Sequence, residues 1–429
     1  MTAWRSGVIY GFVPSQTKLS QVGLAKMGTP VTREHIVSLD ALRGIAAIMV
    51  VLFHTRIASS VFDFPLVRNG HLFVDFFFVL SGFVISMNYL GKLSDNGNVG
   101  VFLVKRIARL WPLHLFTLSI FVLLDAVRLP WSVLNMTATS KTFLSRDYLV
   151  ELWENVFLLQ TFGDSSPNLF NGPNWSISAE FWTYVVFALV VSTFLGKKLA
   201  AMSIILLVFC GLVLTGTVEP HFAENSGYGL FKAIYCFVLG CVTQMIYQSK
   251  VSRSVISAPV TSFLEIAAVA IAIMGVSMSN LPGSPIVTPV LFCLVILILA
   301  IDKGIVAKAL SVEPMKILGK ISYSIYLNHA LILFFTYPIL NRLGGLLGRE
   351  TSHNIQVDGV RTQVFDLGPM WMNNLAVLLV LAVVIASALV TYHSIEMPGQ
   401  RLFRRALSRP SGKTGHLDKE QQSTQPERK

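Results

Sequence analysis

Arg43 and His54 are the first residues of the chain whose types and spacing could support chemistry. Both lie in the apolar segment Ser38 to Arg56, SLDALRGIAAIMVVLFHTR. Their spacing of eleven residues is close to three whole turns of an α-helix, so both side chains project from the same helix face. The rise is roughly 16 Å, about half of a hydrocarbon core roughly 30 Å thick. If the segment spans a membrane with Arg43 at one surface, His54 should lie near the middle.

A histidine inside a membrane span is usually functional, because polar groups there are costly. A neutral imidazole can take a proton from a hydroxyl near neutral pH, so His54 is a candidate general base. The alternative is a structural histidine that bonds to a backbone carbonyl.

Two further arginines lie in the sequence KRIARLWP at 105–112. The spacing i, i+3 places Arg106 and Arg109 on one helix face, and we expect them at the depth of Arg43. Arginine binds phosphate bidentately, so three guanidinium groups at one end of a helix bundle suit a phosphate-rich ligand. The simpler alternative is a cationic anchor at the cytoplasmic surface.

Glu180 lies in the sequence NWSISAEFW at 174–182, near the start of another apolar segment. A carboxylate inside a membrane needs a partner, and His54 is the candidate that we favour. Glu180 would then orient the imidazole, fix its tautomer and raise its basicity. The alternative is a structural ion pair with Arg68 or Arg146.

The remaining candidates are supporting residues in the same apolar segments. Asp75 is the only carboxylate in HLFVDFFFVLSGFVISMNYL; it could pair with an arginine or help to hold a substrate. Gly82 in that segment should allow close helix approach, and Glu396 should form a structural ion pair with Arg401. The other supporting candidates are Asp40, Ser81, Trp175, Ser176 and Tyr326, of which Trp175 could equally belong to an interfacial aromatic belt.

The composition predicts the element type that must position these residues. Of the 429 residues 53% are hydrophobic and 13% are charged, against about 25% charged in soluble domains. With a mean hydropathy of +0.62, the chain is expected to be an all-α polytopic membrane protein. Basic cytoplasmic loops explain the net charge of +11 better than nucleic acid does. All four cysteines lie in apolar stretches without metal-site or CxxC spacing, so no metal is expected.

Ten membrane spans are predicted, with both chain termini cytoplasmic because Lys and Arg collect in the loops of one side. The spans are 41–58, 71–90, 103–124, 175–195, 199–216, 229–248, 260–279, 285–301, 321–341 and 373–393. The segment 149–162 is too short and too charged for a span, so we interpret it as an interfacial or re-entrant helix.

Three regions are expected along the chain: a cytoplasmic N-terminal tail at 1–35, a transmembrane domain at 36–405, and a disordered cytoplasmic tail at 406–429. The two longest outward loops, at 125–174 and 342–372, could form a cap over the outer side of the bundle.

Six ordered motifs together resemble acyltransferase family three, the bacterial integral-membrane O-acyltransferases. They are LDALRGIAAIMVVLFH, FVDFFFVLSGFVI, the R-x-x-R at 106–109, NWSISAEFW, SYSIYLNH and IEMPGQR. The resemblance runs from about residue 36 to 405. It implies ten transmembrane helices, a bacterial inner-membrane location, and transfer of an acyl group, often acetyl, to carbohydrate hydroxyls.

The resemblance also implies that His54, Arg43, Arg106, Arg109 and Glu180 are the functional residues. In the mechanism that it suggests, the three arginines hold the phosphates of acyl-CoA, which is a donor substrate and not a tightly bound cofactor. The thioester reaches His54, which is oriented by Glu180 and deprotonates an acceptor hydroxyl. Whether transfer is direct or passes through a covalent intermediate is open, as is the identity of the carbohydrate.

Two departures from the family pattern leave these residues untouched. The sequence NGHLFVDFF stands where Gly-Gly-x-x-Gly-Val-Asp is usual, and Lys232 stands where arginine is common. The competing hypothesis is a proton-coupled transporter or flippase, which would also place ionisable residues inside the membrane. A sensor or scaffold would leave the buried charges unexplained.

Overall fold

In the computed structural model of this chain, the described residues begin at Ile36. The described residues are 36–94, 98–134, 145–162, 170–194, 197–217, 226–250, 256–279, 283–346, 348–357 and 360–408. The predicted tails at 1–35 and 409–429 lie outside them.

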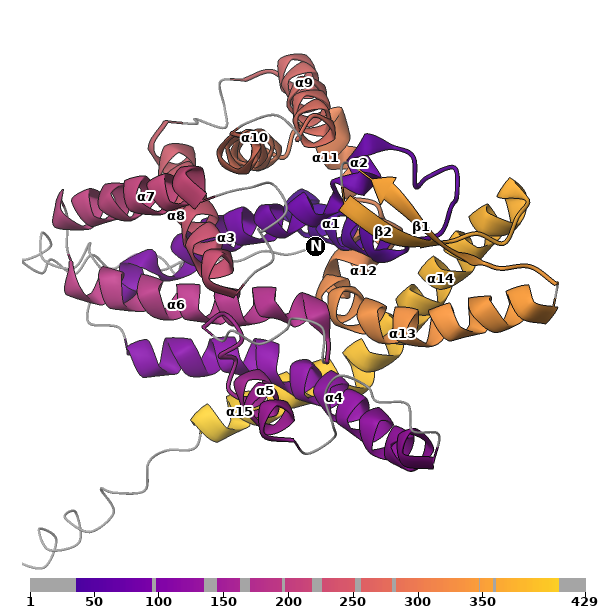
Figure 1. Cartoon of the computed structure of the whole chain (residues 1–429). Coiled ribbons are helices and arrows are strands. Elements are labelled where there is room, and N and C mark those ends of the chain that lie inside the picture. Colours follow the sequence, from indigo (N-terminus) through magenta and orange to yellow (C-terminus); the bar gives the residue numbers. More distant parts are fainter. Residues whose placement is uncertain are drawn as a thin grey trace, which may run out of the picture. The chain divides into compact units, whose positions relative to one another are not determined.

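Long helices dominate the described residues (Figure 1). They are α1 (Val37–His54), α3 (Phe73–Ser94), α4 (Val99–Leu134), α6 (Trp175–Thr193), α7 (Lys197–Thr217), α8 (Ser226–Lys250), α9 (Ala258–Ser277), α10 (Ser284–Leu299), α13 (Ser322–Leu346) and α14 (Met370–Thr391). The shorter helices are α2 (Pro65–Arg68), α5 (Arg146–Val156), α11 (Ile305–Leu310), α12 (Glu313–Lys320) and α15 (Met397–Ser408).

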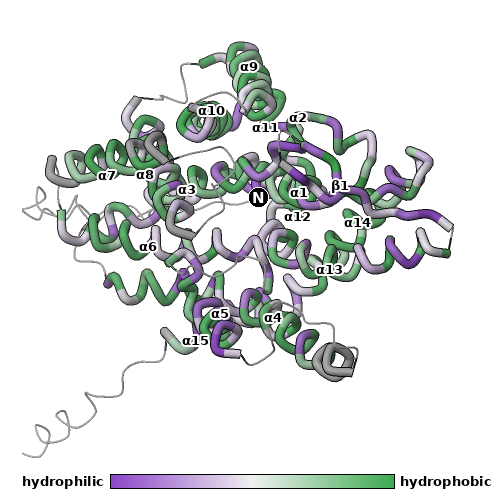
Figure 2. The backbone as a smooth tube through the Cα atoms, in the orientation of Figure 1, coloured by the Kyte–Doolittle hydropathy of each residue, from purple (hydrophilic) through white to green (hydrophobic). Residues whose placement is uncertain are grey.

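Eight helices among the described residues are long and apolar enough to cross a membrane. Two shorter apolar helices, Ala200–Gly211 and Ser284–Leu299, coincide with two more of the predicted spans. Large apolar side chains remain exposed on the outer faces of the bundle, such as Phe263 of α9, which is 71% exposed. The apolar colouring of the helices in Figure 2 fits a lipid environment. The prediction of a helical, multi-pass membrane protein is confirmed, whereas the count of ten spans stays a prediction.

Helix α1 begins and ends four residues earlier than the predicted span 41–58. Arg43 therefore lies well inside the helix, and His54 is its last residue. The predicted span continued beyond His54 to residue 58, but the backbone of Ile57 is used in a β-bridge to Phe365 and not in a helix. The bounds of this span therefore differ from the prediction, whereas the depth of Arg43 and His54 in a membrane stays a prediction.

A β-hairpin in the predicted outward loop 342–372 lies against this end of α1. Strands β1 (Ser352–Val357) and β2 (Val360–Phe365) pair antiparallel. Phe365 exchanges backbone hydrogen bonds of 2.8 Å with Arg56 and Ala58. Its ring stacks on Tyr337 of α13, whose hydroxyl donates to the carbonyl oxygen of His54 at 2.5 Å. Loop 342–372 thus contains a hairpin, whereas the cap over the outer side of the bundle stays a prediction. Residues 135–144 and 163–169 of the other loop lie outside the described residues.

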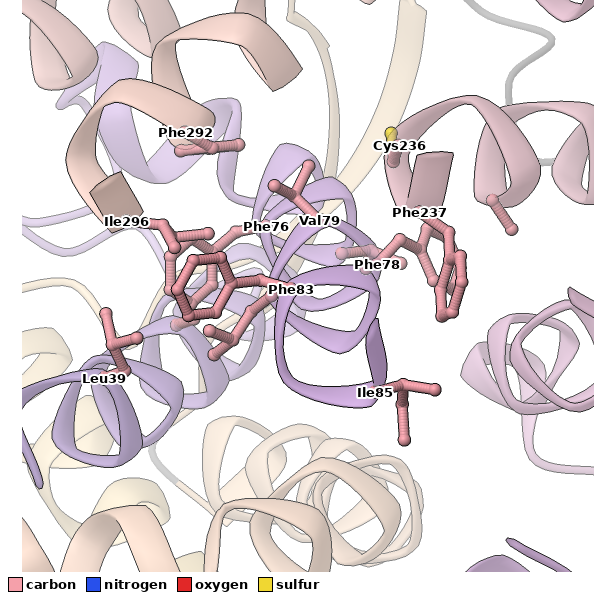
Figure 3. Close-up of a cluster of buried hydrophobic side chains, with 14 of the residues drawn as sticks. Leu39, Phe76, Phe78, Val79, Phe83, Ile85, Cys236, Phe237, Phe292 and Ile296 are labelled. Atoms are coloured by element: carbon pink, nitrogen blue, oxygen red, sulfur yellow. The ribbon is translucent and has the colours of Figure 1, made fainter. Parts of the chain in front are cut away.

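The core of the bundle forms around α3, α8 and α10. Aromatic and aliphatic side chains of α3 point towards α8 on one side and α10 on the other (Figure 3). Helices α3 and α8 approach closely at two glycines. A Cβ atom on Gly82 would lie 2.0 Å from the carbonyl oxygen of Phe237, and one on Gly240 would lie 2.0 Å from that of Val79. The predicted role of Gly82 in close helix approach is confirmed, and Gly240 is its counterpart.

Candidate functional site

Arginines from two helices meet at one site inside the bundle. Arg43 of α1 and Arg109 of α4 are close enough to repel each other. Arg43 also pairs with Asp40, one turn earlier, at 3.4 Å. Glu180 interacts electrostatically with both Arg43 and Arg109. The structure thus brings together two of the three predicted arginines, together with the predicted supporting residue Asp40.

Arg106 adjoins this site through an aromatic cage. Its guanidinium carbon lies 5.1, 5.6 and 5.8 Å from the ring centroids of Tyr89, Phe102 and Tyr184. It donates to the hydroxyl of Tyr89 at 3.2 Å, while its Nε is buried without a described hydrogen bond. Tyr184 is hydrogen-bonded to Glu180, so Arg106 is linked through the Tyr184 ring to the carboxylate that interacts with the other two arginines. We define Arg43, Arg106 and Arg109 as the arginine cluster.

Glu180 lies beside the arginine cluster and is bonded to hydroxyl groups. Its carboxylate accepts hydrogen bonds from Ser81 of α3 at 3.1 Å and from Tyr184, and the two hydroxyl oxygens are 2.6 Å apart. Among the described residues no contact joins Glu180 to His54. The expected base–carboxylate pair is therefore not formed, because the face of α6 that carries Glu180 is turned towards α3 and α4. The alternative partner Arg68 instead pairs with Asp63 at 3.0 Å.

His54 is the last residue of α1, whereas Arg43 lies in the N-terminal half of the same helix. Nδ1 of His54 is 2.9 Å from the carbonyl oxygen of Val50. A carbonyl oxygen only accepts, so Nδ1 carries the proton and Nε2 is the basic nitrogen of the neutral ring. Its ring contacts that of His329 of α13, with centroids 4.9 Å apart.

A row of polar and aromatic side chains lies between the histidines and the arginine cluster. Ser176, Glu180 and Tyr184 share one face of α6 at i, i+4 and i+8. The hydroxyl of Ser176 lies 2.7 Å from that of Tyr326 of α13, and the Tyr326 ring packs edge-on against that of His329 at 5.7 Å. The predicted residues Ser81, Ser176 and Tyr326 are thus all part of this row.

Asp75 and Trp175 have structural surroundings. Asp75 is fully buried and forms a 3.0 Å ion pair with Lys232 of α8. Its partner is therefore the lysine that stands where the family commonly has arginine. The ring of Trp175 packs edge-on against Phe78. A Cβ atom on Gly229 would lie 2.7 Å from a ring carbon of Trp175, so the indole packs closely against this glycine. These contacts match the structural alternative for Asp75 and place Trp175 in the packing of the bundle.

The roles of Glu396 and His329 were not predicted from the sequence. The carboxylate of Glu396 accepts from Ser324 at 2.7 Å and Gln400 at 3.3 Å, and it interacts electrostatically with Arg109. The predicted ion pair of Glu396 with Arg401 was therefore wrong. Both residues lie in family motifs, SYSIYLNH and IEMPGQR, which was the available signal. No group of three or more metal-ligating side chains is found among the described residues.

A bundle of apolar helices that encloses guanidinium, carboxylate and imidazole groups defines a multi-pass membrane protein with a polar internal site. The sequence pattern of the family described as an acyltransferase domain matches residues 36–393. The chain therefore belongs to this acyltransferase family.

Several relatives carry names that specify an activity, among them two OatA proteins. The peptidoglycan O-acetyltransferase OatA of Listeria monocytogenes is 24% identical over 338 residues, which cover 73% of this chain and 52% of the relative. The O-acetyltransferase OatA of Staphylococcus aureus is 26% identical over 336 residues, covering 73% and 52%. The chain thus spans about half the length of the curated relatives that it matches. No solved structure matches it.

Proposed function

We propose that this protein transfers an acetyl group from acetyl-CoA to a hydroxyl of a carbohydrate, as a multi-pass enzyme of the bacterial inner membrane. The observation that carries the proposal is the arginine cluster, joined by a polar row to a histidine whose Nε2 is free to act as a base. Family membership and the names of the relatives point to the same chemistry. They favour a transferase over the transporter hypothesis.

The arginine cluster would bind the phosphates of the donor. Arg43 and Arg109 repel each other across the site, and an anion between them would relieve that repulsion. The buried Nε of Arg106 is a donor without a described partner. A phosphate oxygen could accept from it, since guanidinium groups bind phosphate through two parallel N–H bonds.

His54 would perform the proton transfer. In direct transfer, the acceptor hydroxyl gives its proton to Nε2 of His54 while its oxygen bonds to the thioester carbonyl carbon. The carbon–sulfur bond then breaks, and coenzyme A leaves as a thiolate that takes the proton from His54. The bond from Nδ1 to Val50 fixes the tautomer that this step requires.

Glu180 has a different role in this proposal from the one that its sequence motif suggests. Its contacts with Ser81 and Tyr184 hold it beside the arginine cluster. There its charge offsets part of the mutual repulsion of the guanidinium groups. We assign Glu180 to positioning the donor-binding residues and not to orienting His54.

The acceptor would approach the His54 end of α1, where the β-hairpin packs. The names of the relatives make peptidoglycan the first carbohydrate to test. Purified protein in lipid nanodiscs is given acetyl-CoA labelled in the acetyl group and peptidoglycan fragments, and labelled ester and free coenzyme A are measured. Mass spectrometry of surface glycans from cells with and without the gene then identifies the natural acceptor.

The expected result is transfer by the wild-type protein and none by a folded His54→Ala variant. The exposed residue His393 provides the matched control, and His393→Ala should keep full activity. An active His54→Ala protein would contradict the assignment of the base. Unchanged ester-linked acetyl on every surface glycan after loss of the gene would contradict the proposed function as a whole.

A further inference from the structure

The imidazole rings of His54 and His329 form a contact pair that the proposed reaction does not yet use. Their centroids are 4.9 Å apart and their planes are inclined by 46°. They come from different helices, α1 and α13, and His329 is fully buried. The pair lies at the end of α1 where the acceptor is proposed to arrive.

Backbone carbonyl groups fix the same tautomer in both rings. Nδ1 of His54 bonds to Val50 at 2.9 Å, and Nδ1 of His329 bonds to Tyr326 at 2.5 Å. Since each carbonyl oxygen can only accept, each neutral ring carries its proton on Nδ1 and presents an unprotonated Nε2.

Nε2 of His329 is a buried acceptor without a hydrogen-bond partner in the described structure. Leaving a buried polar atom unsatisfied destabilises the folded protein. Such an atom calls for an explanation in a native protein. A donor that exists only during the reaction provides one.

His114 shows what a purely structural buried histidine looks like in this chain. It is as fully buried as His329, but both of its ring nitrogens are bonded. Nε2 lies 2.8 Å from the carbonyl oxygen of Asn155, and Nδ1 lies 3.1 Å from the amide nitrogen of Asn174. The unpartnered nitrogen of His329 is therefore not a general consequence of burial.

We infer that His329 is a positioning residue for the base, and that its Nε2 accepts a hydrogen bond from His54 when His54 has taken the acceptor proton. This inference rests on the proposed function. His329 would thereby take the place that the sequence motif suggested for Glu180. The new bond forms only after proton transfer, so it stabilises the protonated base without binding either substrate more tightly.

The proton balance of the step is unchanged by this assignment. The acceptor hydroxyl loses its proton to Nε2 of His54, and the new N–H is then shared between the acceptor oxygen and Nε2 of His329. When the carbon–sulfur bond breaks, the same proton passes from His54 to the departing thiolate. His329 keeps its own Nδ1 proton on Tyr326 throughout and is never required to carry a charge in the bundle core.

Two amide substitutions separate this role from packing. In His329→Asn the side-chain amide can still donate to Tyr326 in place of Nδ1, but the acceptor at the Nε2 position is lost. In His329→Gln the longer side chain can place its carbonyl oxygen where Nε2 was. We expect His329→Asn to lower kcat at least tenfold with an unchanged KM for acetyl-CoA, and His329→Gln to recover most of the loss.

The matched controls are His114→Asn and His114→Gln. Both should reduce thermal stability, and their kcat values should not differ from each other as those of the two His329 variants do. Wild-type kcat in His329→Asn, or a greater loss in His329→Gln than in His329→Asn, would overturn the inference. If His54→Ala is inactive in the same assay, either result leaves the proposed function intact.

A measurement that needs no activity completes the test. In protein labelled with ¹⁵N in its histidine rings, the signals of His329 should show a protonated Nδ1 and an unprotonated Nε2. A protonated Nε2 in His329 would overturn the inference even if the wild-type protein transferred no acetyl group.

Discussion

The carboxylate of Glu180 accepts a hydrogen bond from the hydroxyl of Ser81, 3.1 Å away on the neighbouring helix α3. With Tyr184 as its second donor, Glu180 is tied to α3 and to its own helix at once. These two hydrogen bonds hold the carboxylate in place beside the arginine cluster. The two chemical ends of the site are thus separate, with carboxylate and guanidinium groups at one end and imidazoles at the other.

Replacing Arg106 by lysine should weaken donor binding and spare the chemical step. Lysine keeps the positive charge but loses the planar group that stacks among Tyr89, Phe102 and Tyr184 and binds phosphate with two donors. We expect KM for acetyl-CoA to rise roughly tenfold, in line with a loss of about 1.4 kcal/mol, with kcat nearly unchanged. Steady-state kinetics in nanodiscs measures both.

The exposed neighbour Lys105 provides the control for Arg106, since Lys105→Ala removes a charge from the same turn of α4. It should leave KM within a factor of two or so of wild type, because exposed charges contribute little. Equal effects of the two substitutions would argue that Arg106 is only a surface anchor.

Breaking the buried ion pair between Asp75 and Lys232 should destabilise the bundle. Removal of one partner leaves the other charge buried without compensation, which typically costs about 3–5 kcal/mol. We expect Asp75→Asn and Lys232→Met each to lower the midpoint of thermal unfolding in detergent, and the double variant to recover much of the loss. Additive losses in the double variant would show that the two residues act independently.

The sequence predicted the helices well, because hydropathy over about 20 residues reports directly on membrane spans. It did not predict the rotation of each helix about its own axis, which decides whether Glu180 faces His54 or Arg43. That rotation depends on packing between helices distant in sequence, such as α6 against α3. The hairpin had a local signal, Asp358-Gly359 between segments of alternating polar and apolar residues. The interpretation of the chain as membrane spans and loops left this signal unused.

The contact between α3 and α8 should not tolerate any side chain at Gly240. A Cβ atom there would lie 2.0 Å from a carbonyl oxygen of Val79, and backbone cannot move aside as a flexible side chain can. Gly240→Ala should therefore lower the free energy of unfolding by about 1–3 kcal/mol. Gly91→Ala is the matched control on α3, because a Cβ atom at Gly91 would meet no other atom within 4 Å. Equal stability of the two variants would contradict the close approach.

The hairpin beside His54 should loosen in acid through Asp366. The carboxylate accepts hydrogen bonds from the amide of Asn373 at 2.7 Å and from the backbone N–H of Gly368 at 2.8 Å. The bond from Asn373, followed by that from Gly368, lowers the pKa of Asp366 below its ordinary value although partial burial opposes the shift. Because the folded pKa is the lower one, the stabilisation is complete above the ordinary pKa of about 4 and is lost as the pH falls through the folded value.

Hydrogen exchange of the β1–β2 amides, corrected for the intrinsic pH dependence, measures this effect. Protection should be constant from neutral pH to about pH 5 and should decrease below that, in the range where Asp366 takes up a proton. Asp366→Asn should lower protection at neutral pH and remove most of the acid dependence, because its amide oxygen can accept the same bonds but carries no charge. Acid loosening of the same size in Asp366→Asn would assign the effect to another group, such as the nearby His353.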